Sequence, residues 1–395
     1  MDGQALDRIE LIHGVHGRLD RAPEISEDAP MNQDPASRRS ELRKASRRLQ
    51  GHGEVRPAEL LTRVANWCEE HDVTFDSYGT GPLLESFQAK VADLLGFPAG
   101  RFVPTGKLAQ NVAVQVWSER AGIRHFGMHP TSHLELHESR AYSHLFQLRA
   151  TLVGPRNRPL LAEHLAEVAE PLSCLLTELP IREAGGQLPT WEQLEELKRE
   201  ARERDVRLHL DGARLWETAA FYGRSYEEIC RGFDSVYVSF YKGIGALSGA
   251  MLLGEADFLA EATVWQRRCG GEMFELTANV ASAAMQFDER LARMPAYYER
   301  AVALAGVLQD LPGVRTLPRI PHTNLMHVFF ERSVDDVLGA RDKVAEETGW
   351  WLFDRLREAD FPESSRFEWY VGEAACLVEL EELRTAWARL SEVLG

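Results

Sequence analysis

Apolar positions along the chain alternate between short unbroken runs and longer stretches with helical spacing. The short runs have the length of buried strands and lie at Ser173–Glu178, Val206–Leu210, Ser235–Phe240 and Gly249–Leu253. Stretches with helical spacing lie between and around them, at Leu83–Leu95, Gln110–Ala121, Trp191–Arg204 and Phe258–Cys269. Such alternation is typical of β-α-β units. It predicts an α/β fold whose large domain holds a mostly parallel, doubly wound sheet flanked by helices.

A long helical passage from about Leu276 to Leu311 is followed by a second change of pattern. Strand-like and helical stretches then alternate once more, at Thr323–Phe330, Val334–Glu347, Arg366–Val371 and Glu379–Leu394. This restart predicts a smaller α+β C-terminal domain. We expect an irregular N-terminal arm over residues 1–57, the large domain over 58–295 and the small domain over 296–395. The basic run between Arg38 and Arg48 is interpreted as a solvated helix face or an inter-subunit contact.

The charge balance limits the partners of this protein. The chain has 45 Lys+Arg against 61 Asp+Glu and a formal net charge of −16, which disfavours binding to nucleic acid or to an anionic membrane surface. No apolar run reaches the roughly 18 residues that a membrane span requires. The five cysteines are scattered without a Cys-x-x-Cys pair, so we expect reduced thiols in a cytoplasmic protein. A small-molecule substrate fits these features best.

Two charged residues follow predicted strands, where ligands collect in open α/β sheets. Asp211 ends the run Leu208–Asp211 and is followed by Gly212, Ala213 and Arg214, while Lys242 lies just after the run Ser235–Phe240. Pyridoxal 5'-phosphate (PLP) chemistry requires this pair of groups, because a lysine amine captures the cofactor aldehyde and a carboxylate keeps the ring nitrogen protonated. The two residues therefore predict a PLP site. Asp211 is also suited to capping the turn that follows it.

A third segment is a candidate for binding the phosphate. The stretch Phe102–Asn111 has the pattern of a strand, a turn at Gly106 and the start of a helix. The first backbone N–H groups of such a helix have no partner within the helix and can bind an anion. Since similar segments often only connect elements, it is Asp211 and Lys242 that make a phosphate site the better interpretation here.

Taken in order, the motifs resemble those of the threonine aldolase group of β-eliminating lyases. The motifs are Asp76-Ser77-Tyr78-Gly79, Pro104-Thr105-Gly106, Ser132-His133 with Glu138, Glu178 with Gly185-Gly186, His209 to Arg214, and Lys242-Gly243-Ile244-Gly245. The resemblance is clear over roughly residues 70 to 280 and faint beyond. Its most specific part is the occurrence of Asp-Gly-Ala-Arg and Lys-Gly-x-Gly together at matching positions. It implies the PLP-dependent fold type I and a homodimer or homotetramer with active sites at a subunit boundary.

The resemblance also implies roles for single residues. Lys242 would hold PLP, Asp211 would bind the ring nitrogen, and His133 would stack on the pyridine ring near the substrate hydroxyl. Gly106 and the backbone of Lys107 would bind the phosphate. Arg214 and Arg366 would bind the substrate carboxylate, since a guanidinium suits bidentate binding, and Tyr78 would contribute from the neighbouring subunit. Arg214 is alternatively placed to pair with Glu217 three residues on.

Several positions depart from the family pattern and put strict threonine specificity in doubt. The common Glu-Asn-Thr-His run is replaced by Glu178-Leu179-Pro180-Ile181, so a polar wall has become apolar. The glycine-rich segment lacks its usual Arg and reads Gly270-Gly271-Glu272-Met273. Lys107 stands where a Thr is usual, either to add charge at the phosphate or to face solvent. Histidines recur between His125 and His144, but their segment is not a continuous helix, so no metal site is expected.

These features predict retro-aldol cleavage of a β-hydroxy-α-amino acid, such as threonine or allo-threonine, to glycine and an aldehyde. One alternative is β-elimination or another reaction at Cα, in which Lys242 acts as the base. A second alternative is a protein that keeps the PLP scaffold without catalysis.

Overall fold

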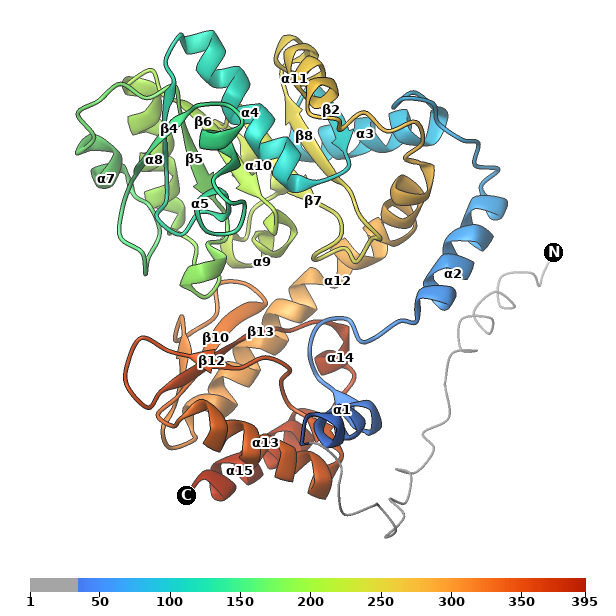
Figure 1. Cartoon of the computed structure of the whole chain (residues 1–395), viewed down its shortest axis with the longest axis vertical. Coiled ribbons are helices and arrows are strands. Elements are labelled where there is room, and N and C mark those ends of the chain that lie inside the picture. The colour runs from blue at the N-terminus through green and yellow to red at the C-terminus, as the bar shows by residue number, and fades with distance from the viewer. Residues whose placement is uncertain (1–34) are drawn as a thin grey trace, which may run out of the picture.

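The computed structural model describes residues 35–395 and contains a large domain built on a seven-stranded sheet and a smaller domain built on a four-stranded sheet (Figure 1). In spatial order the large sheet consists of β2 (Ala99–Val103), β8 (Ala250–Gly254), β7 (Ser235–Ser239), β6 (Arg207–Gly212), β5 (Cys174–Glu178), β3 (His125–Met128) and β4 (Arg149–Leu152). Strand β8 is antiparallel to both of its neighbours, and the other strands share one direction. The prediction of a mostly parallel, doubly wound sheet is therefore confirmed.

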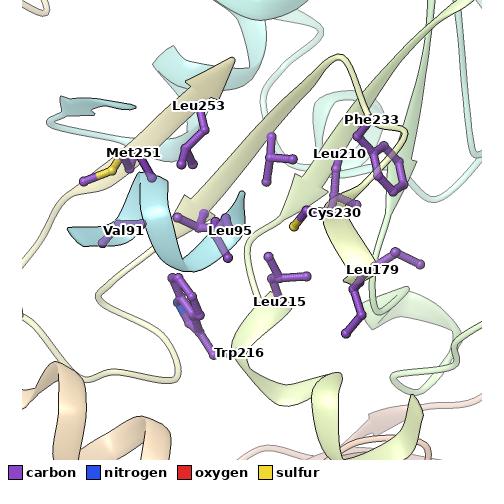
Figure 2. Close-up of a cluster of buried hydrophobic side chains, with 14 of the residues drawn as sticks. Val91, Leu95, Leu179, Leu210, Leu215, Trp216, Cys230, Phe233, Met251 and Leu253 are labelled. Carbon is purple, nitrogen blue, oxygen red and sulfur yellow. The ribbon is translucent and has the colours of Figure 1, made fainter. Parts of the chain in front are cut away.

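Helices cover both faces of this sheet because successive side chains of its buried strands point to opposite faces. In β7, Val236 and Val238 belong to one hydrophobic cluster and Tyr237 to another. The first face is covered by α3 (Pro82–Leu95), α8 (Trp191–Glu203) and α10 (Tyr226–Cys230), and the second by α4 (Gly106–Ala121) and α11 (Ala256–Arg268). Figure 2 shows the first cluster, in which Trp216 lies beneath Val91 and Leu95 of α3.

Further helices and turns complete the large domain. They are α2 (Pro57–Glu70), α5 (His133–Leu136), α6 (Ala141–His144), α7 (Ala162–Ala166), η1 (Arg182–Ala184), η2 (Leu215–Glu217) and α9 (Ala219–Tyr222). Two of them, α5 and η2, begin close to predicted site residues and help to position their side chains.

The small domain has an antiparallel sheet with helices packed on it. Its strands lie in the order β12 (Arg357–Glu358), β13 (Ser365–Tyr370), β10 (Leu325–Phe330) and β9 (Val314–Leu317). Its helices are α13 (Val334–Thr348), α14 (Glu373–Cys376) and α15 (Leu380–Leu394). The long helix α12 (Thr277–Gln309) contacts α2 and α3 as well as β9 and α15, and so joins the two domains (Figure 1). Because α12 continues past residue 295, the domain limits given above stay a prediction.

The described part of the N-terminal arm packs on the small domain. Helix α1 (Pro35–Ala45) contacts α13, and β1 (Arg47–Arg48) pairs in parallel with β11 (Trp350–Trp351). Arg38 and Arg39 form ion pairs with Glu346 and Asp342 of α13. The basic run is therefore a helix face that binds acidic groups of its own chain, although exposed pairs of this kind stabilise a protein only slightly. Residues 1–34 of the predicted arm lie outside the described residues.

Two further observations bear on the sequence-based expectations. The five cysteines are all free thiols, which agrees with the absence of a disulfide framework. Over residues 35–395, every helix is too short or too polar to serve as a membrane span.

Candidate active site

The predicted cofactor residues meet at the carboxyl edge of the large sheet. Asp211 lies near the end of β6, Lys242 follows the end of β7, and Gly106 begins α4 directly after β2. Because β2, β6 and β7 share one direction, their carboxyl ends lie at the same edge. The structure therefore brings together three segments, of which the first and the last, at Gly106 and Lys242, are 136 positions apart in the sequence.

Asp211 is a buried carboxylate with two neutral donors. Only 2% of its surface is exposed. Its Oδ2 accepts a hydrogen bond from the side-chain amide of Gln110 on α4, and its Oδ1 accepts one from the backbone N–H of Ala213, at 3.0 Å. The contact to Ala213 is the local turn interaction that the sequence left open, and it coexists with a site role. Each carboxylate oxygen can accept a further hydrogen bond, so a ring N–H can bind here.

Lys242 has a half-buried amine whose surroundings favour its neutral form. Burial lowers the pKa of Lys242, and the neighbouring Arg214 lowers it further, while Asp211 and Glu178 oppose this shift. Among residues 35–395 no hydrogen bond or ion pair holds this amine. A lysine with a depressed pKa is a better nucleophile near neutral pH, as capture of an aldehyde requires.

Glu178 lies beside Asp211 because the two are register partners across β5 and β6. Burial raises the pKa of Glu178 to about 8, and the nearby Asp211 acts in the same direction. The apolar residues that follow it, Leu179 and Ile181, are themselves buried. The residue after them, Arg182, is polar and half-exposed, so this segment supplies charged groups as well as apolar ones.

The start of α4 offers backbone donors in a tight space. Thr105 caps the helix, since its hydroxyl accepts a hydrogen bond from the backbone N–H of Leu108 at 3.2 Å. A Cβ added to Gly106 would lie 1.9 Å from the hydroxyl of the buried Tyr237, so a residue without a side chain is needed there. The side chain of Lys107 is exposed, which agrees with its solvent-facing interpretation. The free N–H groups of this first turn fit a phosphate.

His133, the first residue of α5, is held by a buried acid. Its Nδ1 lies 2.8 Å from Oε1 of Glu138, whose other oxygen accepts a hydrogen bond from the side-chain amide of Asn111 at 2.7 Å. An ionised carboxylate only accepts hydrogen bonds, so Nδ1 carries the proton and Nε2 is left as the basic nitrogen. About a third of the His133 side chain is exposed, which leaves the ring free to contact a ligand.

Arg214 is almost fully buried between two carboxylates. Its Nη1 lies 3.5 Å from Glu217 and its Nη2 lies 3.6 Å from Glu368 on β13 of the small domain. The alternative pairing with Glu217 is therefore present in the structure. Its guanidinium also lies 5.1 Å from the ring centre of Tyr370. Arg214 thus connects the large domain to β13.

The two remaining predicted substrate residues differ in their placement. Arg366 lies on the same face of β13 as Glu368, since residues two apart on a strand share a face, and its guanidinium lies 3.3 Å from His327. Tyr78 lies apart from this group. Its backbone N–H donates to the carbonyl of Phe274, the two rings stack edge to face, and 56% of its surface is exposed.

Several residues that line this site lie outside the motifs that indicated a role in the sequence. Gln110 is one helical turn after Gly106, and that spacing alone would have placed it on the same helix face. Glu368 is two residues after Arg366 in a strand, which is the corresponding signal for a strand face. Glu217 was noted only as a partner of Arg214. No local signal identifies Glu368 as a partner of Arg214, because they belong to different domains.

The recurring histidines have other partners. His129 hydrogen bonds with Thr131 and with the carbonyl of Pro155, and His125 hydrogen bonds with Thr151. Within residues 35–395, no group of three His, Cys, Asp or Glu side chains is arranged to hold a metal ion.

These residues fit PLP. A buried carboxylate, an amine with a depressed pKa and a helix start that excludes a side chain match the ring nitrogen, the aldehyde and the phosphate of that cofactor. Together with the doubly wound sheet and the smaller C-terminal domain, they define a PLP-dependent enzyme of fold type I.

Comparison with known proteins identifies the family. Residues 75–333 match the model of the Beta-eliminating lyase family, and the chain belongs to that family. Low-specificity L-threonine aldolase 1 of Arabidopsis thaliana is 25% identical over 289 residues, which cover 70% of this chain and 79% of that protein. The protein is thus a PLP-dependent lyase related to the threonine aldolases, and this assignment favours an enzyme over a scaffold without catalysis.

Two solved structures are more similar still. A protein of Listeria monocytogenes EGD-E, provisionally assigned as an L-allo-threonine aldolase, is 37% identical with a TM-score of 0.86, over 91% of this chain and 99% of that one. A protein of Exiguobacterium sp. 255-15, provisionally assigned as an aromatic amino acid beta-eliminating lyase/threonine aldolase, is also 37% identical. Its TM-score is 0.85, over 90% of this chain and 99% of that one.

Proposed function

We propose that this enzyme cleaves the Cα–Cβ bond of a β-hydroxy-α-amino acid resembling threonine or allo-threonine, and releases glycine and an aldehyde. The observation that carries the proposal is His133, whose Nδ1 is held by Glu138 so that Nε2 remains basic. A base is what this reaction needs at the β-hydroxyl, because removal of its proton lets the Cα–Cβ electrons leave toward Cα. PLP, when bound, withdraws electrons from Cα and so stabilises the charge left there.

Five residues would hold the cofactor. Lys242 would bind it covalently through its ε-amine, and Asp211 would hold the proton on the ring nitrogen. The backbone N–H groups of Gly106 and Lys107 would bind the phosphate. His133 would stack on the pyridine ring. This set is supported by the convergence of their elements at the carboxyl edge of the large sheet.

Arg214 would bind the substrate carboxylate, with Arg366 as a second contact. Burial alone would raise the pKa of Glu368, but the nearby His327 and the guanidinium groups of Arg214 and Arg182 outweigh it and lower this pKa to about 2. Burial raises the pKa of Glu217 to about 7, so Glu217 is partly neutral near that pH. When Glu217 is neutral, the ionised Glu368 is the remaining charged partner of Arg214 in this cluster, and the guanidinium can attract a substrate carboxylate more strongly than when both acids are ionised.

The proton of the β-hydroxyl would pass to Nε2 of His133. The resulting imidazolium would be stabilised by Glu138, whose buried carboxylate is oriented by the amide of Asn111. A carboxylate at Nδ1 both fixes the ring and favours its charged form. The same imidazolium can return a proton to the product.

A substrate panel tests this reaction. We expect threonine, allo-threonine or phenylserine to yield glycine and aldehyde at least about ten times faster than serine or cysteine yields ammonia and a keto acid. Glycine and aldehyde are measured by chromatography, and ammonia and keto acid by coupled enzymes. The Lys242→Ala variant is the blank.

The panel also decides the alternative. The name given to the Exiguobacterium structure includes a β-eliminating lyase, and in an elimination Lys242 would take the Cα proton while the β substituent leaves. Keto acid without glycine from the panel would replace the aldolase proposal with elimination.

We further propose that the enzyme is a homo-oligomer in which Tyr78 reaches a neighbouring active site. Phe75, Tyr78, Met273 and Phe274 are large apolar residues with 75%, 56%, 43% and 59% of their surface exposed. Tyr78 and Phe274 contact each other, and exposed apolar groups of this kind favour an interface between proteins.

Light scattering is expected to give at least twice the mass of 44.6 kDa calculated for one chain. A charge at the centre of the apolar surface, Phe274→Asp, is expected to weaken the assembly by about ten-fold or more. Val264→Asp, at an exposed apolar residue of α11, is the control. Monomeric wild-type protein would contradict the proposal.

A further inference from the structure

A short segment of the N-terminal arm, residues 46–53, is fastened to the strand that carries Glu368. Leu49 is fully buried in the core of the small domain. Gln50 donates a hydrogen bond from its side-chain amide to the carbonyl of Glu368 at 3.2 Å, and Gly51 donates its backbone N–H to the carbonyl of Tyr370 at 2.9 Å. We call residues 46–53 the strap. It follows the backbone of β13, so its position is tied to the small domain.

At the end of the strap, His52 reaches into the large domain. Its Nε2 lies 3.0 Å from the carbonyl oxygen of Gly243, and its Nδ1 lies 3.0 Å from Nη1 of Arg290 on α12. Gly243 is the residue directly after Lys242. One imidazole therefore joins the small domain, the long helix and the turn that carries Lys242.

The two shortest contacts of the His52 ring, to Gly243 and Arg290, determine which ring nitrogen carries its proton. A guanidinium only donates hydrogen bonds and a carbonyl only accepts them. Nδ1 therefore accepts from Arg290, and Nε2 carries the proton and donates to Gly243. Burial lowers the pKa of His52 to about 4, and the charge of Arg290 acts in the same direction. The ring is thus neutral near pH 7, and its single N–H is directed at the turn after Lys242.

The ring is also held in place by its surroundings. Its centre lies 5.3 Å from that of Tyr297 and 5.6 Å from that of Tyr370. A Cβ at Gly372 would lie 2.8 Å from Nδ1, so the adjoining backbone leaves no room for a side chain there. Arg290 donates a hydrogen bond to the hydroxyl of Tyr297 at 2.8 Å. These contacts leave His52 little freedom to rotate.

We propose that His52 is a positioning residue for the cofactor lysine: its hydrogen bond to Gly243 fixes the turn that carries Lys242 and ties that turn to the strap and to β13. The arm thereby sets the cofactor lysine relative to the strand that carries Glu368 and Arg366. The inference rests on the proposed role of Lys242 and assigns a function to the arm. His52 acts through the backbone and does not itself touch the substrate.

Two amide variants separate this hydrogen bond from general packing. In His52→Gln the side-chain amide extends to about the position of Nε2 and can donate to Gly243, whereas in His52→Asn the shorter amide extends only to about the position of Nδ1. Loss of one net hydrogen bond corresponds to roughly a ten-fold change in an equilibrium constant. We expect His52→Asn to bind PLP about ten times more weakly than wild type, and His52→Gln to stay within about three-fold.

The affinity is measured by titrating apoprotein with PLP and following the visible absorbance, and the rate of hydride-trapped adduct formation on Lys242 is followed by mass spectrometry. Arg39→Ala, which removes an exposed ion pair between α1 and α13, is the control for docking of the arm and is expected to match wild type. If His52→Asn does not fold, His52→Leu takes its place with the same expected loss.

Two results of the PLP titration would overturn the proposed role of His52. Equal PLP affinity in wild type and His52→Asn would overturn it, and so would an equal loss in His52→Asn and His52→Gln, because the hydrogen bond would then not be the cause. Absence of a trapped adduct on Lys242 in wild type would instead overturn the proposed function. The two failures are therefore distinguishable.

Discussion

Replacing Lys242 by alanine is expected to remove the visible absorbance of the bound cofactor and to lower kcat/KM by about 10⁴-fold or more. The ε-amine is the nucleophile that would hold PLP, and no other lysine lies at the carboxyl edge with a comparable environment among residues 35–395. Burial and the neighbouring Arg214 depress the pKa of this amine. Alanine has no amine, so the variant could not bind PLP covalently at this position. The measurement combines absorbance of the purified variant with steady-state kinetics on the best substrate of the panel.

Lys90→Ala is the matched control, because Lys90 is a surface residue that pairs with Asp288. It is expected to keep the absorbance and the activity of wild type. After reduction with borohydride, mass spectrometry should find the adduct on the Lys242 peptide of wild type and of Lys90→Ala, and no adduct on the corresponding peptide of Lys242→Ala. An adduct on another lysine would show that the site has been misplaced.

Neutralising Asp211 as Asp211→Asn is expected to lower kcat by about 10²- to 10³-fold. The variant keeps the size of the side chain but removes the buried charge that would hold a proton on the ring nitrogen, so the ring would withdraw electrons less strongly. Because Asp211 raises the pKa of Lys242, the pKa of the free lysine should fall further in the variant. A pH titration of the rate of PLP capture by apoprotein measures that shift.

Asp288→Asn, a surface change at the partner of Lys90, serves as the control and should leave both quantities as in wild type. A variant Asp211→Asn with unchanged kcat would remove Asp211 from the proposed chemistry. An upward shift of the Lys242 pKa would contradict the electrostatic argument even if activity fell.

If the hydrogen bond from His52 fixes the turn after Lys242, the position of Lys242 depends on contacts outside the large domain. Lys242 and Asp211 belong to the large domain, but the strand with Glu368 and Arg366 belongs to the small one. Glu368 contacts Arg214 directly, and the strap contacts both β13 and the turn after Lys242. A change in the packing of the two domains would therefore alter the proposed substrate contacts and the position of Lys242 together.

The sequence alone predicted the elements and indicated Asp211 and Lys242 as the candidate cofactor residues. Runs such as Ser235–Phe240 and helices such as Trp191–Arg204 were predicted nearly to their observed ends, since apolar periodicity and caps such as Thr190 act over a few residues. Asp211 and Lys242 were predicted as site residues because each lies at or just after the end of a strand, and parallel strands of a doubly wound sheet bring such residues to one edge.

Only the tertiary structure decided what surrounds that pair. The antiparallel direction of β8, the contact between Arg214 and Glu368, and the hydrogen bond from His52 to Gly243 each join segments far apart in the chain. No local pattern encodes them, because they depend on how the two domains and the arm pack. The sequence therefore indicated which groups could bind the cofactor. The packing of the two domains and the arm decided which other residues form hydrogen bonds and ion pairs around those groups.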